Sequence, residues 1–241
     1  MEKELALKSN RKKPTLSIIV PVFNEEKTIL PLLEKVRKVK LMGFQKQIIV
    51  VDDGSGDGTA ALLQKVSKRV ILFLRHEKNK GKGAAIRTAI PHTTGDFVII
   101  QDADLEYDPG DYEKLLMPLL DGSSDVVYGS RFLGPHRAFL FWHFIGNKFL
   151  SLVTNVLYNT ILTDMETCYK VFKGDVIRGL KLRSNRFEFE PEVTAKILKK
   201  GYKLYEIPIS YHGRGFEEGK KITWRDGITA LAALVRYRFM D

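Results

Sequence analysis

The first half of the chain alternates between two patterns of apolar residues. Short, mostly apolar runs predict buried strands, and they lie at 15–22, 47–51, 70–74, 97–101 and 125–128. The segments between them carry apolar residues at the three- and four-residue spacing of amphipathic helices, and they cover 27–39, 59–68, 83–90 and 112–120. Strands that alternate with helices predict an α/β fold, with a Rossmann-like, mainly parallel sheet and helices on both faces.

Acidic residues gather where the predicted strands end. Asp52 and Asp53 close the second strand. Four carboxylates follow the fourth strand within seven residues, namely Asp102, Asp104, Glu106 and Asp108. The carboxyl ends of parallel strands share one edge of a sheet, which is where α/β proteins bind ligands. Carboxylates this close repel one another and lose water at the end of a buried strand, so a positively charged ligand is expected among them.

The composition is that of one folded domain with an excess of positive charge. The 241 residues are 44% hydrophobic and have a formal net charge of +10, which is enough apolar material for one sizeable core. Cys168 is the single cysteine, so no internal disulfide can form and an intracellular location is expected. We expect a basic polar tail at 1–13, one domain at 14–213, and a basic C-terminal segment with an amphipathic helix at 214–241.

Two glycine-rich stretches do not fit the better-known nucleotide-binding motifs. GSGDGT at 54–59 lacks the G-x-G-x-x-G spacing, and GKGAAI at 81–86 lacks the earlier glycine and the Ser or Thr of a P-loop. A dinucleotide-dependent dehydrogenase and a P-loop NTPase are therefore disfavoured.

The positive charge alone would suit a non-catalytic nucleic-acid-binding protein. No nucleic-acid-binding motif accompanies that charge, and the acidic edge of the sheet would repel phosphate unless a metal were bound. No nucleic-acid partner is therefore expected.

Five stretches, in this order and spacing, resemble the family 2 glycosyltransferases with the GT-A fold: SIIVPVFNEEKTI, VDDGSGDGT, NKGKGAAIRTAI, DFVIIQDADLEYDP and GSRF. The second half, with LTDMETCYKVF, RFEFEPEVTAKILKKGYKLYEIPISY and GKKITWRDG, is similar to the branch of dolichyl-phosphate mannose and glucose synthases and their bacterial polyprenyl-phosphate counterparts. The resemblance covers about residues 15–240. It implies an inverting, metal-dependent transfer of a hexose from GDP-mannose or UDP-glucose to polyprenyl or dolichyl phosphate, with a nucleotide-binding half at 14–104 and an acceptor half at 105–213.

The resemblance also implies roles for the acidic edge. Asp102 and Asp104 form the D-x-D element that, with Glu106, would bind Mg²⁺ or Mn²⁺ against the donor diphosphate, and hard oxygen ligands suit these cations better than zinc. Asp52 resembles the aspartate that accepts from the nucleobase, and both uracil and guanine supply N–H donors, so the base stays open. The residues expected to contact the nucleotide sugar are Pro21, Val22, Glu25, Asp52, Asn79, Gly81, Lys82, Asp102, Ala103 and Asp104.

The acceptor site is expected around Arg131 in GSRF, with Arg137 as a second cation for the acceptor phosphate. A lipid phosphate is largely dianionic at neutral pH, so a strong general base is not required. Arg131 and Asp164 are the expected catalytic residues. Asp164 either orients a sugar hydroxyl or acts as base for a hydroxyl acceptor, which keeps open a family 2 enzyme that glycosylates a saccharide or a protein. Glu188 and Glu190 either match a paired-acid element of the branch or place charge at a helix N-terminus.

Two segments favour contact with a membrane surface over a membrane span. No acidic residue lies between Asp125 and Asp164, and the aromatic-rich stretch 138–162 is too often interrupted by polar residues to cross a bilayer. With the C-terminal segment it predicts an interfacial surface on anionic lipid, although both helices could instead pack on the core. The expected interfacial aromatic residues are Trp142, Phe144, Trp224, Tyr237 and Phe239. The expectation is a cytoplasmic protein held peripherally at the cytoplasmic face of a membrane, directly or through a membrane-protein partner.

Overall fold

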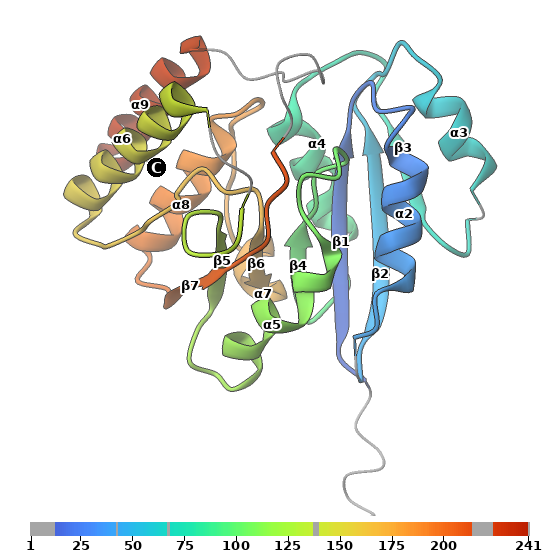
Figure 1. Cartoon of the computed structure of the whole chain (residues 1–241), viewed down its shortest axis with the longest axis horizontal. Coiled ribbons are helices and arrows are strands. Elements are labelled where there is room, and N and C mark those ends of the chain that lie inside the picture. Colours follow the sequence, from blue (N-terminus) through green and yellow to red (C-terminus); the bar gives the residue numbers. More distant parts are fainter. Residues whose placement is uncertain (1–12, 42, 67, 137–139, 214–223, 241) are drawn as a thin grey trace, which may run out of the picture.

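The computed structural model of the chain describes residues 13–41, 43–66, 68–136, 140–213 and 224–240 (Figure 1). Within these residues, seven strands form one sheet in the order β3-β2-β1-β4-β6-β5-β7. The strands are β1 (Thr15–Val22), β2 (Gln45–Asp52), β3 (Leu72–Arg75), β4 (Phe97–Ile100), β5 (Val126–Ser130), β6 (Lys170–Lys173) and β7 (Leu204–Pro208). Almost all of the expected tail, the start of the expected C-terminal segment and Arg137 lie outside the described residues.

Parallel pairing dominates the sheet, and one strand runs against the others. β1 pairs in parallel with β2 and β4, β2 with β3, and β5 with β7. β6 lies antiparallel between β4 and β5, with Phe172 opposite both Val98 and Val126. The predicted mainly parallel sheet is confirmed, and each strand predicted from the first half is present with ends that differ by no more than two residues.

The strands β6 and β7 have no counterpart among the elements predicted from the sequence. β6 is four residues long with lysine at both ends, and β7 carries Glu206 in its middle and Pro208 at its end. Neither segment has the continuous apolar run or the regular alternation that indicates a strand. Their position in the sheet comes from pairing with β4 and β5, which are distant in sequence.

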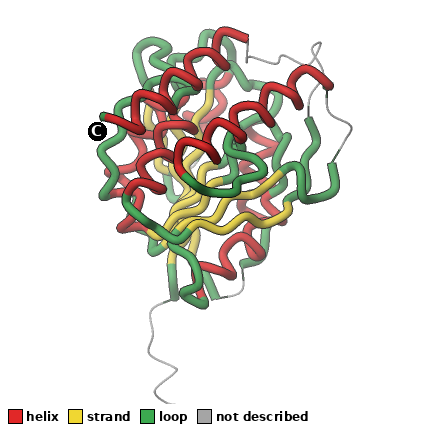
Figure 2. Tube along the Cα trace, turned by 90° about the vertical axis from the view of Figure 1, so that its left-hand side faces the viewer, coloured by secondary structure: helices red, strands yellow, loops and turns green. Residues whose placement is uncertain are grey.

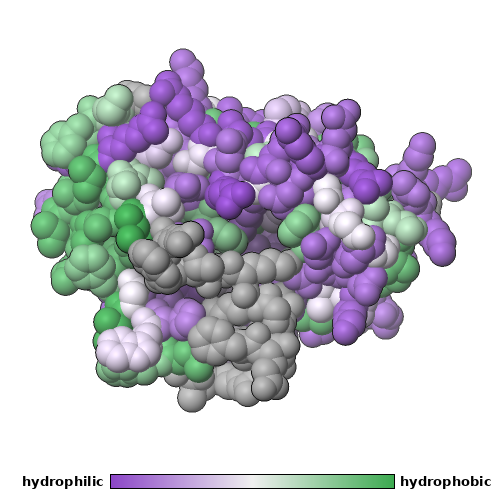
Figure 3. Space-filling model, turned by 90° about the horizontal axis from the view of Figure 1, so that it is seen from above, coloured by the Kyte–Doolittle hydropathy of each residue, from purple (hydrophilic) through white to green (hydrophobic). Residues whose placement is uncertain are grey.

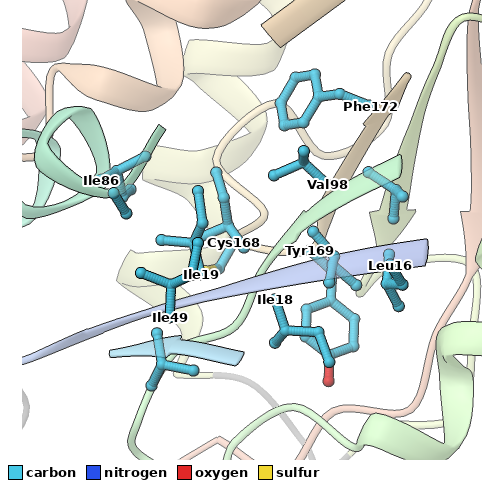
Figure 4. Close-up of a cluster of buried hydrophobic side chains, with 14 of the residues drawn as sticks. Leu16, Ile18, Ile19, Ile49, Ile86, Val98, Cys168, Tyr169 and Phe172 are labelled. Atoms are coloured by element: carbon cyan, nitrogen blue, oxygen red, sulfur yellow. The ribbon is translucent and has the colours of Figure 1, made fainter. Parts of the chain in front are cut away.

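Helices cover both faces of the sheet (Figures 1 and 2). Every residue of β1 from Leu16 to Val22 is buried, and successive side chains of a strand point to opposite faces, so both faces must be packed. Figure 4 shows this for Ile18 and Ile19, which extend from β1 into a core that also holds Ile49 of β2 and Ile86 of α4. The helices are α2 (Ile29–Lys38), α3 (Thr59–Lys65), α4 (Lys82–Ala89), α5 (Tyr112–Leu120), α6 (Phe141–Tyr158), α7 (Gly174–Arg178), α8 (Phe189–Lys199) and α9 (Trp224–Phe239).

Three helices of the second half form a layer beside the β5–β7 end of the sheet. α9 packs on both α6 and α8, and the three lie together at the upper left of Figure 1. Leu150 and Met165 pack there with Ala230 and Leu234 in a second apolar cluster, separate from the main core. Among the described residues, no helix is both long and apolar enough to cross a bilayer.

Candidate active site

Four strand ends bring most of the predicted site residues to one edge of the sheet. β1, β2 and β4 are parallel, and β5 runs the same way because both β4 and β5 are antiparallel to β6. Asp52 ends β2, Asp102 and Asp104 follow β4, and Arg131 directly follows β5. Figure 3 looks down on this edge and shows hydrophilic residues over its centre, with a hydrophobic surface to one side. The acidic edge predicted from the sequence is therefore present.

Asp52 is fully buried at the end of β2. Its Oδ1 accepts a hydrogen bond from the Ser55 backbone N at 3.0 Å. Its Oδ2 lies 3.0 Å from Arg75 Nε, yet no hydrogen bond reaches Oδ2 from the described residues. An acceptor oxygen in a buried position is the feature that recognition of a nucleobase N–H requires.

The loops after β1 and β2 are tied together by side chains. Asn24, in the left-handed region at φ 52°, donates its backbone N to Ser55 Oγ at 2.9 Å and accepts from the Gly56 N at 2.9 Å. Glu25 donates its backbone N to Thr59 Oγ1, and its Oε2 accepts from Thr28 Oγ1 at 2.6 Å. Glu25 is thus buried and held, while Pro21 and Val22 lie within β1 beneath this loop.

Asp53 organises the loop between β3 and α4. Its Oδ1 lies 2.6 Å from His76 Nδ1 and accepts from the Lys80 N at 2.9 Å, while its Oδ2 accepts from the Gly81 N at 2.7 Å. The sequence suggests only that Asp53 closes a strand. Its partners lie more than twenty residues away, so no local pattern indicates them.

Gly81 and Lys82 carry this loop to the acidic edge. Gly81 has φ 102°, and a Cβ there would lie 2.4 Å from the Asn185 carbonyl oxygen, so only glycine fits. Lys82 Nζ lies 3.0 Å from Asp102 Oδ1 and 3.0 Å from Glu190 Oε1. Burial alone would lower the pKa of Lys82, but these carboxylates hold that pKa well above its ordinary value. The ammonium therefore stays charged beside the D-x-D element.

The three predicted metal ligands have different partners. Asp102 pairs with Lys82, Asp104 Oδ1 accepts from the Glu106 backbone N at 3.1 Å, and Glu106 Oε2 accepts from the Tyr211 hydroxyl at 2.6 Å. Where the structure describes side chains, no three His, Cys, Asp or Glu residues gather into a metal-binding group. Any cation here would need ligands from the substrate besides those of the protein. Of the other predicted donor residues, Ala103 is buried and Asn79 is exposed.

Arg131, directly after β5, forms a buried ion pair with Asp164. Arg131 Nε donates to Asp164 Oδ2 and Nη2 donates to Oδ1, both at 2.7 Å, and the Arg131 backbone N donates to Oδ2 at 3.0 Å. Asp164 is fully buried, while the Arg131 side chain remains 12% exposed. The Arg131 Cζ also lies 5.4 Å from the centroid of the Tyr211 ring, whose hydroxyl reaches Glu106. Tyr211 thus stands between the acidic edge and the arginine.

Two buried carboxylate oxygens near this pair have no hydrogen-bond partner among the described residues, Glu166 Oε1 and Glu190 Oε2. Burial, reinforced by the Glu190 carboxylate, raises the pKa of Glu166 to about 8. Burial also lowers the pKa of the adjacent Lys170, whose Nζ donates to the Met165 carbonyl oxygen at 2.9 Å. Glu190 lies in the first turn of α8, but its side chain reaches Lys82, which a role in the helix N-terminus alone does not require.

An exposed apolar surface begins next to Arg131. Phe132 packs edge-on against Phe144 of α6 at a centroid distance of 5.3 Å, and Lys148 Nζ lies 4.1 Å from the Phe132 centroid. The apolar face, as we call it, consists of exposed side chains of α6 and α9: Phe141, Trp142, Ile145, Phe149, Leu152, Val156, Ile228, Val235 and Phe239. It lies on the side where Figure 3 is most hydrophobic. Of the aromatic residues expected at a membrane, Trp142 and Phe239 are exposed, Phe144 is half-buried and Tyr237 is buried; the Trp224 side chain lies outside the described part.

The glycosyl transferase family 2 pattern matches residues 17–180. An uncharacterized protein of Methanocaldococcus jannaschii is 31% identical over 216 residues, which are 87% of this chain and 86% of that protein. The low-salt glycan biosynthesis hexosyltransferase Agl6 of Haloferax volcanii is 32% identical over 205 residues, or 83% of this chain and 48% of Agl6. The glycosyltransferase AglJ of the same organism is 28% identical over 199 residues, or 82% of this chain and 63% of AglJ.

Solved structures of glucosyl-3-phosphoglycerate synthase from Mycobacterium tuberculosis share the fold. One, in complex with Mn²⁺, UDP and glucosyl-3-phosphoglycerate, has a TM-score of 0.74 at 17% identity and covers 98% of this chain and 83% of that one. Another, with Mn²⁺ and UDP-glucose, has a TM-score of 0.73 at 18% identity and covers 100% of this chain and 84% of that one. The GT-A fold predicted from the sequence is confirmed.

Proposed function

The chain belongs to glycosyl transferase family 2, and from this membership we propose that it is an inverting, metal-dependent hexosyltransferase. Its donor would be GDP-mannose or UDP-glucose, and its acceptor a polyprenyl or dolichyl phosphate at a membrane surface. The observation that supports this choice of acceptor is the position of Arg131 between the acidic edge and the apolar face. A cation beside an exposed apolar surface suits an amphiphile with an anionic head and an apolar chain.

The donor side fits a nucleotide diphosphate that carries a divalent cation. Asp102 and Asp104 offer carboxylate oxygens on partly buried side chains, the ligand type that Mg²⁺ and Mn²⁺ prefer. Glu106 is the third candidate ligand, although its carboxylate accepts from Tyr211. When bound, the cation would neutralise charge on the leaving diphosphate. Lys82 is the protein's own cation at this place, and it would bind the diphosphate once the metal has taken Asp102.

A hexose suits the two buried oxygens that lack partners. Glu190 Oε2 can accept a hydrogen bond, whereas the Glu166 carboxyl, with a pKa of about 8, is protonated at neutral pH and can also donate one; sugar hydroxyls both donate and accept. Leaving such groups buried without a hydrogen-bond partner costs about 1–3 kcal/mol each. A bound hexose would remove that cost, and this supports a sugar donor whose ring lies near α8.

The acceptor phosphate would bind Arg131, which Asp164 holds in one orientation through two parallel hydrogen bonds. A phosphate that is largely dianionic at neutral pH can attack the anomeric carbon without a base. One displacement inverts that carbon. Arg137, the second expected cation, remains a prediction because it lies outside the described residues.

The apolar face supports peripheral attachment to a membrane. Trp142 is 79% exposed, Val156 74% and Phe239 78%, and no acidic residue lies on α6. A polyprenyl chain extends from a bilayer, so a face that enters the lipid interface would bring Arg131 to the phosphate. With a net charge of +10, the protein would favour the anionic cytoplasmic leaflet. A membrane-protein partner on the same face is the second way to reach that location.

A hydroxyl acceptor on a saccharide or a protein is the second candidate function. It needs a base near the acceptor, and Asp164 is the residue expected for that role. Because both Asp164 oxygens already accept hydrogen bonds from the Arg131 guanidinium, neither is free to accept the proton of an acceptor hydroxyl in this arrangement. The lipid-phosphate acceptor is therefore preferred.

A transfer assay tests the proposal. Radiolabelled GDP-mannose and UDP-glucose are each offered with a short polyprenyl phosphate, a polyprenyl alcohol or an oligosaccharide, in the presence of Mn²⁺ or of a chelator. We expect label in the organic phase with one donor only, with the phosphate only, and only with metal. Label on the alcohol or the oligosaccharide but not on the polyprenyl phosphate would contradict the proposed lipid-phosphate acceptor.

A further inference from the structure

We propose that Glu206 of β7 is a positioning residue that sets Asp164 against Arg131. The inference rests on the proposed function for the role of the Arg131–Asp164 pair in acceptor binding. The geometry of the pair does not depend on any substrate. Glu206 lies opposite Tyr128 in the pairing of β5 and β7, in the sequence LYEIP.

Glu206 binds the turn that carries Asp164 through both of its carboxylate oxygens. Oε1 accepts from the Thr163 N at 3.0 Å, from the Thr163 hydroxyl at 3.1 Å and from the Asp164 N at 3.1 Å. Oε2 accepts from the Thr163 N at 2.8 Å. An ionised carboxylate has about four acceptor sites and no donor, so this set of contacts selects for it.

The same turn is held from its other side. Lys148 Nζ of α6 donates to the Thr163 carbonyl oxygen at 3.2 Å, and Ser130 Oγ lies 2.6 Å from Thr163 Oγ1. Ser130 directly precedes Arg131. Thr163 is therefore fixed at its N–H, its carbonyl and its hydroxyl by residues of β7, α6 and β5. Glu206 is the carboxylate among these contacts.

This arrangement determines where the Asp164 carboxylate lies. Asp164 is fully buried, so its side chain has no room to compensate for a shift of its backbone. Its two oxygens fix the plane of the Arg131 guanidinium, whose remaining N–H groups would receive the acceptor phosphate. A displaced turn would therefore disturb acceptor binding through Arg131, although Glu206 itself touches no substrate.

The donor half should not respond to the same change. The hydrogen bonds of the Glu206 side chain go to Thr163 and Asp164, whereas the donor loops are held by Asp53, Ser55 and Thr59. Burial raises the pKa of Glu206, which is the cost of placing a carboxylate at this position. If Glu206 were needed only for folding, its substitution would be expected to affect the kinetics of the donor and of the acceptor alike.

The first experiment compares Glu206→Gln with wild type in steady-state transfer. The glutamine amide keeps the shape of the glutamate side chain. In one orientation its NH₂ group takes the place of Oε2 and faces the Thr163 N–H, and in the other it takes the place of Oε1, which accepts three hydrogen bonds. We expect KM for the acceptor to rise at least about tenfold while KM for the donor stays within about twofold. Asp125→Asn is the matched control, because Asp125 also accepts a backbone N–H beside β5, from Lys203 at 3.0 Å, but at the opposite end of the strand.

A double-mutant cycle separates positioning from stability. In an Arg131→Lys background the Glu206→Gln change should have little further effect on the acceptor, since both act through one guanidinium. Equal additional losses in the two backgrounds, or a fall in kcat with both KM values unchanged, would overturn the proposal. If Glu206→Gln does not fold, Thr163→Val removes the hydroxyl contacts alone and should give a smaller loss in the same acceptor-specific direction; no loss there would also overturn it.

A spectroscopic measurement tests Glu206 even if the proposed acceptor is wrong. The Arg131 Nε–H resonance is assigned by its absence in Arg131→Lys. We expect it to be sharp and slowly exchanging in wild type and in Asp125→Asn, and broadened or lost in Glu206→Gln. An unchanged Arg131 resonance in Glu206→Gln would refute the positioning role. Failure of transfer to polyprenyl phosphate with the expected resonance change would instead refute only the proposed function.

Discussion

Asp164 accepts three hydrogen bonds from Arg131, two from the guanidinium and one from the backbone N. The two residues are thirty-three positions apart, and the pair forms because the turn before β6 returns to the end of β5. Burial would lower the pKa of Arg131, but Asp164 outweighs that effect and raises it. The arginine is therefore a permanent cation of fixed orientation, which is what binding an anionic acceptor requires.

The first prediction concerns Arg131→Lys. A lysine keeps the charge but loses the planar pair of donors, so the acceptor phosphate would meet a cation of uncertain position. We expect kcat/KM for the acceptor to fall between about tenfold and a hundredfold, with donor KM unchanged. Steady-state kinetics with Arg37→Lys, at an exposed position of α2, as the control checks this. An equal change in the two KM values would contradict the assignment of Arg131 to the acceptor.

Removal of the cation should also destabilise the fold. Arg131→Met leaves the fully buried Asp164 carboxylate without its partner, and an uncompensated buried charge costs about 3–5 kcal/mol. Chemical denaturation should show a loss of this size, reduced when Asp164→Asn is added. A variant as stable as wild type would mean that Asp164 is neutral or solvated.

Gly81 gives a second prediction, on the donor side. Gly81→Ala places a Cβ at 2.4 Å from the Asn185 carbonyl oxygen in a conformation of φ 102°, so the loop that carries Lys82 must move. We expect nucleotide diphosphate binding, measured by calorimetry with Mn²⁺, to weaken at least about tenfold. Gly146→Ala is the control: it lies in α6 with no atom within 4 Å of the added Cβ, and it should stabilise the protein by up to about 1 kcal/mol. Equal nucleotide affinity in both variants would contradict the role of this loop.

The elements that the sequence predicts well are those with a strong local pattern. The strand from Thr15 to Val22 is mostly apolar and the Asp102–Asp104 pair follows an apolar strand directly, so both are visible in a short window. By contrast, β6 owes its place to pairing with β4 and β5, and Glu206 contacts Thr163 forty-three residues away. The partner of Lys82 on α8, Glu190, is farther still. Such contacts depend on how the chain packs, and no periodicity along the sequence carries that information.

The third prediction is a pH dependence of stability that originates in Glu166. Its pKa is raised from 4.5 to about 8 in the folded state by burial. Between these two values the unfolded chain has released the proton and the folded chain has not, so stability falls as pH rises from about 4.5 to about 8. Denaturation of wild type and Glu166→Gln over this range should give a difference in unfolding free energy that declines with pH and levels off above it. A constant difference would show that Glu166 is ionised at neutral pH.

The fourth prediction concerns the apolar face. Trp142→Glu and Phe149→Glu each place a charge on an exposed apolar surface of α6, and each should weaken partition to anionic vesicles at least about tenfold. Met117→Glu, at a 56% exposed position on α5, is the control and should not. Flotation with vesicles that contain phosphatidylserine provides the readout. Vesicle binding that is equal in all variants would contradict a membrane role for this face.

The most direct test is the anomalous scattering of manganese in crystals grown with Mn²⁺ and a nucleotide sugar. We expect a peak beside a carboxylate of Asp102 or Asp104 and the diphosphate, with Lys82 moved off Asp102 and onto a phosphate oxygen. A saturated donor site without manganese at those carboxylates, with Lys82 still paired to Asp102, would contradict it.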